Sequence, residues 1–123
     1  MRIVPQLCAL AVTTALALGS TTERAEAFQQ ISDPETFNRL VIGRELTRVG
    51  IRLQVHPEGQ ISGRGMGYPV TGEWQWRNGY FCRTLDWGGS DLGYNCQAVQ
   101  ADGNRVRFVS DQGSGDSAIF RLR

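Results

Sequence analysis

The sequence predicts a mainly β protein: a small antiparallel up-and-down barrel or rolled meander of about eight strands, with one N-terminal helix. Apolar and polar residues alternate along most of the chain after residue 50, as in strands with one buried face. Asn78-Gly79 and Asp102-Gly103 are two-residue hairpin signals. Between them, Cys82 and Cys96 are spaced to face each other on the arms of a further hairpin. One register therefore links four consecutive strands.

The first 27 residues are expected to form a secretory signal peptide. Arg2 provides a basic start, and the apolar run from Cys8 to Leu18 is too short to span a bilayer. Ala25-Glu26-Ala27 fits an A-x-A cleavage site. The mature chain is then expected to be a single domain, Phe28–Arg123, in the periplasm or secreted, with no membrane span.

Export also predicts the state of the cysteines. Removal of Cys8 leaves Cys82 and Cys96, and an oxidising compartment favours a disulfide between them; two free thiols are the alternative. The chain has 13 basic residues, every one an arginine, and 12 acidic residues. This near balance argues against a nucleic-acid partner. The absence of lysine excludes Schiff-base and P-loop chemistry.

A short helix is predicted at the start of the mature chain. Asp33 fits an N-cap, Pro34 fits the first helical position, and Gly43 fits the end. The apolar residues on one face of this helix are Phe37, Leu40 and Val41. The sequence does not decide whether that face covers the outside of the barrel or closes one of its ends.

The period then changes to two, and turn residues divide the chain into strands. The expected strands are Arg44–Arg48, Ile51–Val55, Gln60–Arg64, Val70–Trp76, Tyr80–Asp86, Gly93–Gln100, Arg105–Ser110 and Ala118–Arg123. The Asn78-Gly79 turn pairs Trp76 with Phe81, and a Cys82–Cys96 bond pairs Phe81 with Gln97.

The Asp102-Gly103 turn extends this register by pairing Val99 with Val106, and Gln97 with Phe108. The residues expected on the core face are Trp74, Trp76, Phe81, Val99, Val106 and Phe108. The cystine is expected on the opposite face.

The same register turns Arg83, Asn95 and Gln97 inward. Buried polar side chains need partners, so they indicate either a partly polar ligand cavity or hydrogen bonds to one another and to backbone carbonyls. Trp87, beside two glycines, either stacks on a ligand or partner or caps the barrel mouth. Arg83, Trp87, Asn95 and Gln97 are therefore the candidate ligand-binding residues.

One end of the barrel is expected to carry the longer loops, where function concentrates on β scaffolds. These loops are Gly65–Pro69, Trp87–Gly93 and Gln112–Asp116. Four carboxylates fall at this end: Asp86, Asp91, Asp111 and Asp116. They indicate a cation site or, with greater weight, ordinary turn residues. No catalytic residue, metal or cofactor is predicted.

Much of the mature chain resembles a family of small exported alphaproteobacterial proteins. The shared motifs read Leu46-Thr47-Arg48-x-Gly50-Ile51, Val70-Thr71-Gly72-x-Trp74-x-Trp76, Gly79-Tyr80-Phe81-Cys82-Arg83, Asp91-Leu92-Gly93-x-Asn95-Cys96-Gln97 and Arg107-Phe108-x-Ser110-Asp111-x-Gly113-x-Gly115. Some members carry the label dihydrodipicolinate reductase, and the resemblance implies that activity. Nicotinamide chemistry requires a strand, a G-x-G-x-x-G turn and a helix, a pattern that the sequence lacks.

The function predicted from these features is an exported, non-enzymatic binding module that holds a small ligand or an envelope protein at the glycine-rich loop end. The alternative within binding is an inhibitor of an envelope hydrolase. The alternative of a different class is an enzyme, either the reductase of the resemblance or one that uses Asp91, Asp111 or Asp116 as an acid.

Overall fold

A computed structural model of the chain describes Ala11, Thr13 and residues 27–123. The predicted signal peptide, with Cys8, lies outside the described residues except for Ala11, Thr13 and Ala27. The elements are β1 (Gln29–Ile31), α1 (Pro34–Val41), β2 (Glu45–Arg48), β3 (Ile51–Val55), β4 (Gln60–Gly65), β5 (Tyr68–Arg77), β6 (Tyr80–Trp87), β7 (Ser90–Asp102), β8 (Arg105–Val109), a 3₁₀ turn (Asp111–Gly113) and β9 (Ser117–Leu122).

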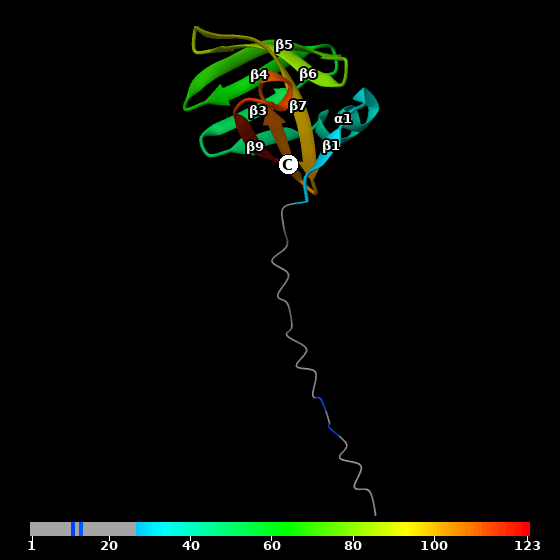
Figure 1. The fold of residues 1–123 in the computed structure, drawn as a ribbon. Coiled ribbons are helices and arrows are strands. Elements are labelled where there is room, and N and C mark those ends of the chain that lie inside the picture. Colours follow the sequence, from blue (N-terminus) through cyan, green and yellow to red (C-terminus); the bar gives the residue numbers. More distant parts are fainter. Residues whose placement is uncertain (1–10, 12, 14–26) are drawn as a thin grey trace, which may run out of the picture.

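Strands β2 to β9 form a closed antiparallel barrel in which each strand pairs with the next along the chain (Figure 1). The ring closes where β2 pairs with β9, through Leu46 opposite Leu122 and Thr47 opposite Arg121. Closure leaves these eight strands without a free edge, and an edge is the part of a sheet most prone to aggregation. The predicted alternative of an open rolled meander is therefore excluded.

The predicted register is confirmed from β5 to β7. Trp76 lies opposite Phe81, and Phe81 lies opposite Gln97. Cys82 and Cys96 are direct cross-strand partners joined by a disulfide. Asn78 and Gly79 have φ values of 52° and 84°, the left-handed conformations that a type I′ turn requires.

The register predicted between β7 and β8 is wrong by two residues. Val99 lies opposite Phe108, and Asp102 lies opposite Arg105, so the turn residues are Gly103 and Asn104. Gly103 has φ 58°, which fits a turn with glycine in its first central position. A shift of two residues preserves every face, because side chains alternate with period two. The predicted core face is therefore still correct.

Two of the three predicted long loops are tight hairpins. Gly65 pairs with Tyr68, so Met66-Gly67 is a two-residue turn. Trp87 pairs with Ser90, so the β6–β7 connection is Gly88-Gly89. A register irregularity after Leu85 lets these strands run on beyond the predicted ends. Only the segment from Ser110 to Asp116 remains as the longer connection at this end of the barrel, among the described residues.

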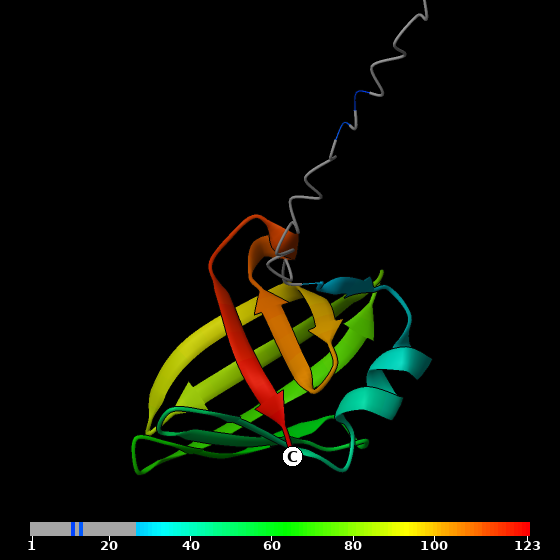
Figure 2. The ribbon, with the colours of Figure 1, turned by 90° about the horizontal axis from the view of Figure 1, so that it is seen from below.

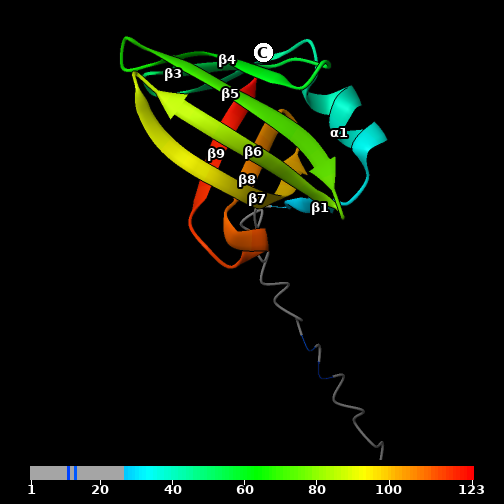
Figure 3. The same ribbon diagram turned by 90° about the horizontal axis from the view of Figure 1, so that it is seen from above.

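Helix α1 closes the end of the barrel that carries the Asn78-Gly79 turn (Figures 2 and 3). The Asp33 side chain accepts a hydrogen bond from the Thr36 backbone N–H at 2.9 Å, so Asp33 is the N-cap as predicted. Phe37 and Val41 are fully buried against the barrel interior. This settles the question that the sequence left open: the apolar face of the helix covers a barrel end and not its outer wall.

Strand β1 is an addition that the sequence analysis did not predict. Ile31 pairs with Val99, and Gln29 pairs with Ala101. These β7 residues follow Gln97, the last β7 residue that pairs with β6. Ile31 is buried in the same core as Phe37. The strand therefore covers the part of β7 that the shorter β6 leaves unpaired. No helix among the described residues is long and apolar enough to cross a membrane.

Candidate functional site

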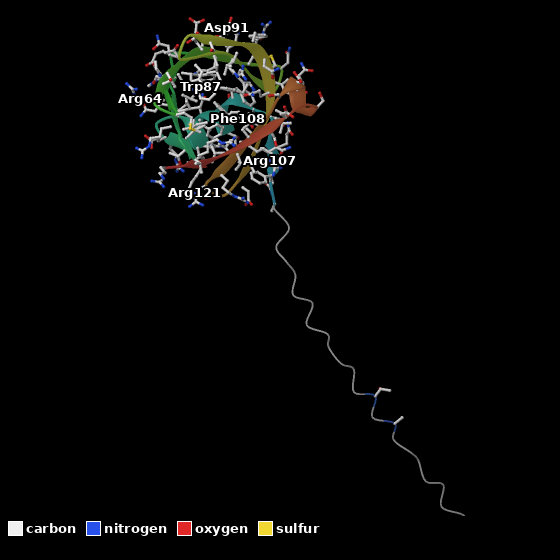
Figure 4. The ribbon with its side chains drawn as sticks, turned by 90° about the vertical axis from the view of Figure 1, so that its left-hand side faces the viewer. Arg64, Trp87, Asp91, Arg107, Phe108 and Arg121 are labelled. Carbon is white, nitrogen blue, oxygen red and sulfur yellow. A yellow bond between two sulfur atoms is a disulfide. The ribbon has the colours of Figure 1, made fainter. Side chains whose placement is uncertain are left out.

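The barrel contains a cavity of about 180 Å³ that is partly open to solvent. Its lining is formed by Leu46, Leu53, Val55, Phe81, Arg83, Leu85, Gln97, Phe108, Ala118 and Phe120. Phe108 lies inside the barrel in Figure 4. Eight of the ten lining residues are apolar, and the polar side chains come from Arg83 and Gln97. An apolar cavity of about 150 Å³ accommodates a single benzene ring in a model protein, so this one has room for an aromatic ring or a short acyl chain.

Arg83 is a half-buried cation in the wall of this cavity. Its guanidinium Nη1 donates a hydrogen bond to the Gly93 carbonyl oxygen at 3.0 Å. Burial removes water from the guanidinium and lowers the pKa of Arg83 below its ordinary value. No carboxylate among the described residues forms an ion pair with it. A positive charge without a counter-ion therefore faces an apolar space.

Gln97 is the second polar group of the lining, directly opposite Phe81 on the neighbouring strand. Its side-chain Nε2 donates to the Ser110 hydroxyl at 3.3 Å. This bond directs the amide toward the Ser110–Asp116 connection. The amide is thereby placed where that connection meets the cavity wall.

Asn95 does not line the cavity. Its Nδ2 donates to Asp111 Oδ1 at 2.8 Å, and its Oδ1 accepts from the Asp111 backbone N–H at 3.0 Å. Asp111 and Gln112 both have left-handed backbone conformations, with φ of 55° and 56°. The two-way contact with Asn95 therefore holds the start of this connection in a conformation that is unfavourable for residues other than glycine.

Trp87 also lies outside the cavity lining. Its indole N–H donates to the Gly65 carbonyl oxygen at 2.8 Å, across the strands β4, β5 and β6. A methyl group added to Gly65 would lie 3.1 Å from the indole nitrogen, so Gly65 leaves the space that the ring occupies. Trp87 as a whole residue is 37% exposed. Of the two alternatives for Trp87, this geometry matches a cap over the barrel mouth.

Three of the four carboxylates at this end accept hydrogen bonds from neighbouring backbone or amide groups. Asp86 Oδ1 accepts from the Gly89 N–H at 2.9 Å, and Asp91 Oδ1 accepts from the Gly93 N–H at 2.8 Å. Asp111 accepts from the Asn95 amide. Among the described residues, no three His, Cys, Asp or Glu side chains cluster in a way that could hold a metal ion.

Sequence reasoning placed Arg83, Gln97, Phe81 and Phe108 on the inner face but did not single out the other apolar residues of the cavity lining. Leu53 and Leu85 are such residues, and period-two alternation was sufficient to place both on the inner face. Phe120 contributes a ring that also carries the guanidinium of Arg48, 5.6 Å from the ring centroid. That contact joins β9 to β2 across the barrel closure, a pairing that hairpin turns do not reveal.

Comparisons with protein-family models, with curated proteins and with solved structures found no match for this chain.

Proposed function

We propose that the protein is an exported, non-enzymatic binding module that holds a small ligand inside its barrel. The observation that carries this proposal is half-buried Arg83, which forms no ion pair with the described residues, on the wall of a mostly apolar cavity. The Cys82–Cys96 disulfide is compatible with an oxidising location outside the cytoplasm.

The chemistry of the cavity defines the ligand class. Leu53, Leu85 and Phe120 offer apolar surface to a ring or a short chain. Arg83 offers guanidinium N–H donors to an anion, and charge-assisted hydrogen bonds of this kind are about twice as strong as neutral ones. The ligand is therefore a small organic anion with an apolar body and a carboxylate or similar head group.

The loop geometry favours this ligand over a protein partner. Inhibition of a hydrolase requires protruding loops, but the Met66-Gly67 and Gly88-Gly89 connections are two-residue hairpins. Acid catalysis at Asp91 or Asp111 is less well supported, because their carboxylates already accept hydrogen bonds from the Gly93 N–H and from the Asn95 amide.

The proposal is tested with benzoate and its neutral analogue benzyl alcohol, whose single ring matches the cavity volume. Titration calorimetry should show benzoate binding about 10- to 100-fold more tightly than benzyl alcohol, as expected for one charge-assisted contact. Arg83→Met keeps the side-chain length without the charge and should abolish this preference. Arg77→Met is the matched control, because Arg77 is an exposed arginine at the end of β5 and does not line the cavity. This variant should retain the preference for benzoate.

Equal affinity for the two compounds in the unmodified protein, or a preference for benzoate that survives Arg83→Met, would reject the role of Arg83. Thermal melting of both variants separates a loss of binding from a loss of folding. Native mass spectrometry of gently prepared protein then identifies the mass of any ligand that is carried through purification.

A further inference from the structure

A second surface, independent of the cavity, lies on the outer wall of β2, β3, β4 and β9. It is an open groove of about 630 Å³. Its lining is formed by Thr47, Arg48, Val49, Gly50, Ile51, Arg52, Arg64, Gly67, Arg121 and Arg123. Half of these residues are arginines, although the whole chain has a net charge of only +1. Positive charge is therefore concentrated on one face.

Three of these arginines stand in one row across four strands, called the arginine row here: Arg64, Arg52 and Arg121. Arg64 lies opposite Arg52, Arg52 opposite Thr47, and Thr47 opposite Arg121. Arg64 and Arg121 lie at the periphery of the barrel in Figure 4. Like charges directly opposite each other on neighbouring strands are destabilising. The fold therefore carries the directly opposed pair Arg64 and Arg52 at a cost, which indicates a use other than stability.

Little in the described structure neutralises the arginine row. Arg52 Nη1 lies 4.0 Å from Glu45 Oε1, at the limit of an ion pair, and its side chain is 73% exposed. Arg64 Nη1 donates to the Gly67 carbonyl oxygen at 3.0 Å, so its charge is held beside the Met66-Gly67 turn. Both guanidinium groups remain available to an external anion.

The tips of the β2–β3 hairpin and the β4–β5 hairpin, next to the arginine row, are apolar and exposed. Val49 is 91% exposed and Met66 is 58% exposed. The tips touch, since a methyl group added to Gly50 would lie 2.5 Å from the Met66 sulfur. Met66 also has φ 50°, in the first position of a turn that favours asparagine, aspartate or glycine. Neither solubility nor turn geometry explains a methionine at this position.

The distance from the hairpin tips to the arginines matches the depth to which apolar groups of peripheral proteins enter a lipid surface. Arg52 and Arg64 are each two residues from the glycine or methionine of the nearest tip, about 7 Å along a strand. Apolar groups of peripheral proteins enter the boundary of head groups and acyl chains by about 5–10 Å, and arginines at the surface contact the phosphates. Tips and row can therefore engage the same surface together.

We infer that Val49 and Met66 insert into an anionic phospholipid surface while the arginine row binds its phosphate groups. This docking does not depend on the ligand proposed for the cavity. The charge of the row complements the surface, and the apolar tips distinguish a lipid partner from a soluble polyanion.

Co-sedimentation with vesicles tests the inference. Vesicles of phosphatidylcholine and phosphatidylglycerol in equal parts should sediment the protein in a salt-sensitive manner, and vesicles of phosphatidylcholine alone should not. Arg52→Gln combined with Arg64→Gln should weaken partitioning about 30-fold, from roughly 1 kcal/mol for each charge. Arg39→Gln combined with Arg77→Gln removes the same charge away from the groove and should leave partitioning unchanged.

Met66→Asn separates binding from folding. Asparagine adopts left-handed φ more readily than methionine, so this variant should be at least as stable as the unmodified protein. Loss of the apolar tip should nevertheless weaken partitioning about tenfold. Equal sedimentation with both kinds of vesicle, an equal loss in the two arginine double variants, or no effect of Met66→Asn would overturn the inference. Binding to heparin without binding to vesicles would assign the row to a soluble polyanion instead.

Discussion

The rings of Phe37 and Phe81 lie with their centroids 5.2 Å apart and join the N-terminal helix to the barrel interior. Phe37 contacts Trp74 and Trp76 as well, at centroid distances of 5.6 Å and 5.2 Å. Phe81 continues the contact to Phe108 at 5.3 Å. The helix is thus part of one aromatic core, because it closes a barrel end that would otherwise expose these rings to water.

Removal of the Phe37 ring should strongly destabilise the protein. Phe37 is fully buried, so Phe37→Ala loses its transfer free energy and leaves a void between the helix and the barrel. The expected loss is about 3–5 kcal/mol of unfolding free energy, measured by urea denaturation. Arg39→Ala on the exposed side of the same helix should change stability by less than about 0.5 kcal/mol. Similar losses in the two variants would contradict the placement of the helix.

The two tryptophans of β5 should respond differently to replacement by phenylalanine. The Trp74 indole N–H donates to the His56 carbonyl oxygen at 2.8 Å. The buried Trp76 Nε1 has no hydrogen-bond partner among the described residues. Trp74→Phe removes a bond, whereas Trp76→Phe removes an unsatisfied donor. Denaturation of both variants should show Trp74→Phe to be more costly by about 1–3 kcal/mol. The opposite order would show that Trp76 has a partner in solution.

Reduction of the disulfide should lower stability without changing the strand register. The bond between Cys82 and Cys96 spans 14 residues along the chain, and its loss should cost about 3 kcal/mol in the chain-entropy model. The double variant Cys82→Ala and Cys96→Ala should unfold at a lower urea concentration and should not respond to a reductant. A double variant as stable as the oxidised protein would show that the cross-strand hydrogen bonds suffice.

The N-cap should make stability depend on pH. Hydrogen bonds from the Thr36 backbone N–H and hydroxyl hold the pKa of Asp33 below its ordinary value. A carboxylate with a lowered pKa in the folded state stabilises the fold above its unfolded pKa and loses this contribution as the pH falls through the folded value. The urea midpoint of the unmodified protein should therefore exceed that of Asp33→Ala at neutral pH. The difference should shrink between about pH 5 and about pH 2, and a difference independent of pH would argue against this cap.

Local signals in the sequence were sufficient for the strand faces and for much of the register. Asn78-Gly79 fixed one hairpin because type I′ turns select these residues. At Asp102-Gly103 the same reasoning misplaced the turn by one residue and the register by two, because glycine there occupies the first central position. Period-two alternation protected the assignment of faces from that error, so Arg83 and Gln97 were still placed on the inner wall.

Loop lengths were not predictable in the same way. The segment from Trp87 to Gly93 reads as a loop because it is rich in glycine, yet most of it continues the β6 and β7 strands around a two-residue turn. The segment from Gly65 to Pro69 behaves similarly. Pairing with a neighbouring strand overrode the weak local propensity of these residues, which is the usual reason that strand ends are misassigned.

The sequence by itself predicted a β barrel or rolled meander with one capped helix, cysteines that meet across neighbouring strands, and an arginine that faces the interior. These properties depend on turn residues, alternation and capping, which act over a few positions. Only the tertiary structure decided that β9 returns to β2, because no turn joins them and their pairing depends on the curvature of the whole sheet. That closure creates the cavity beside Arg83 and brings Arg121 level with Arg52 and Arg64, so both proposed sites exist only in the folded barrel.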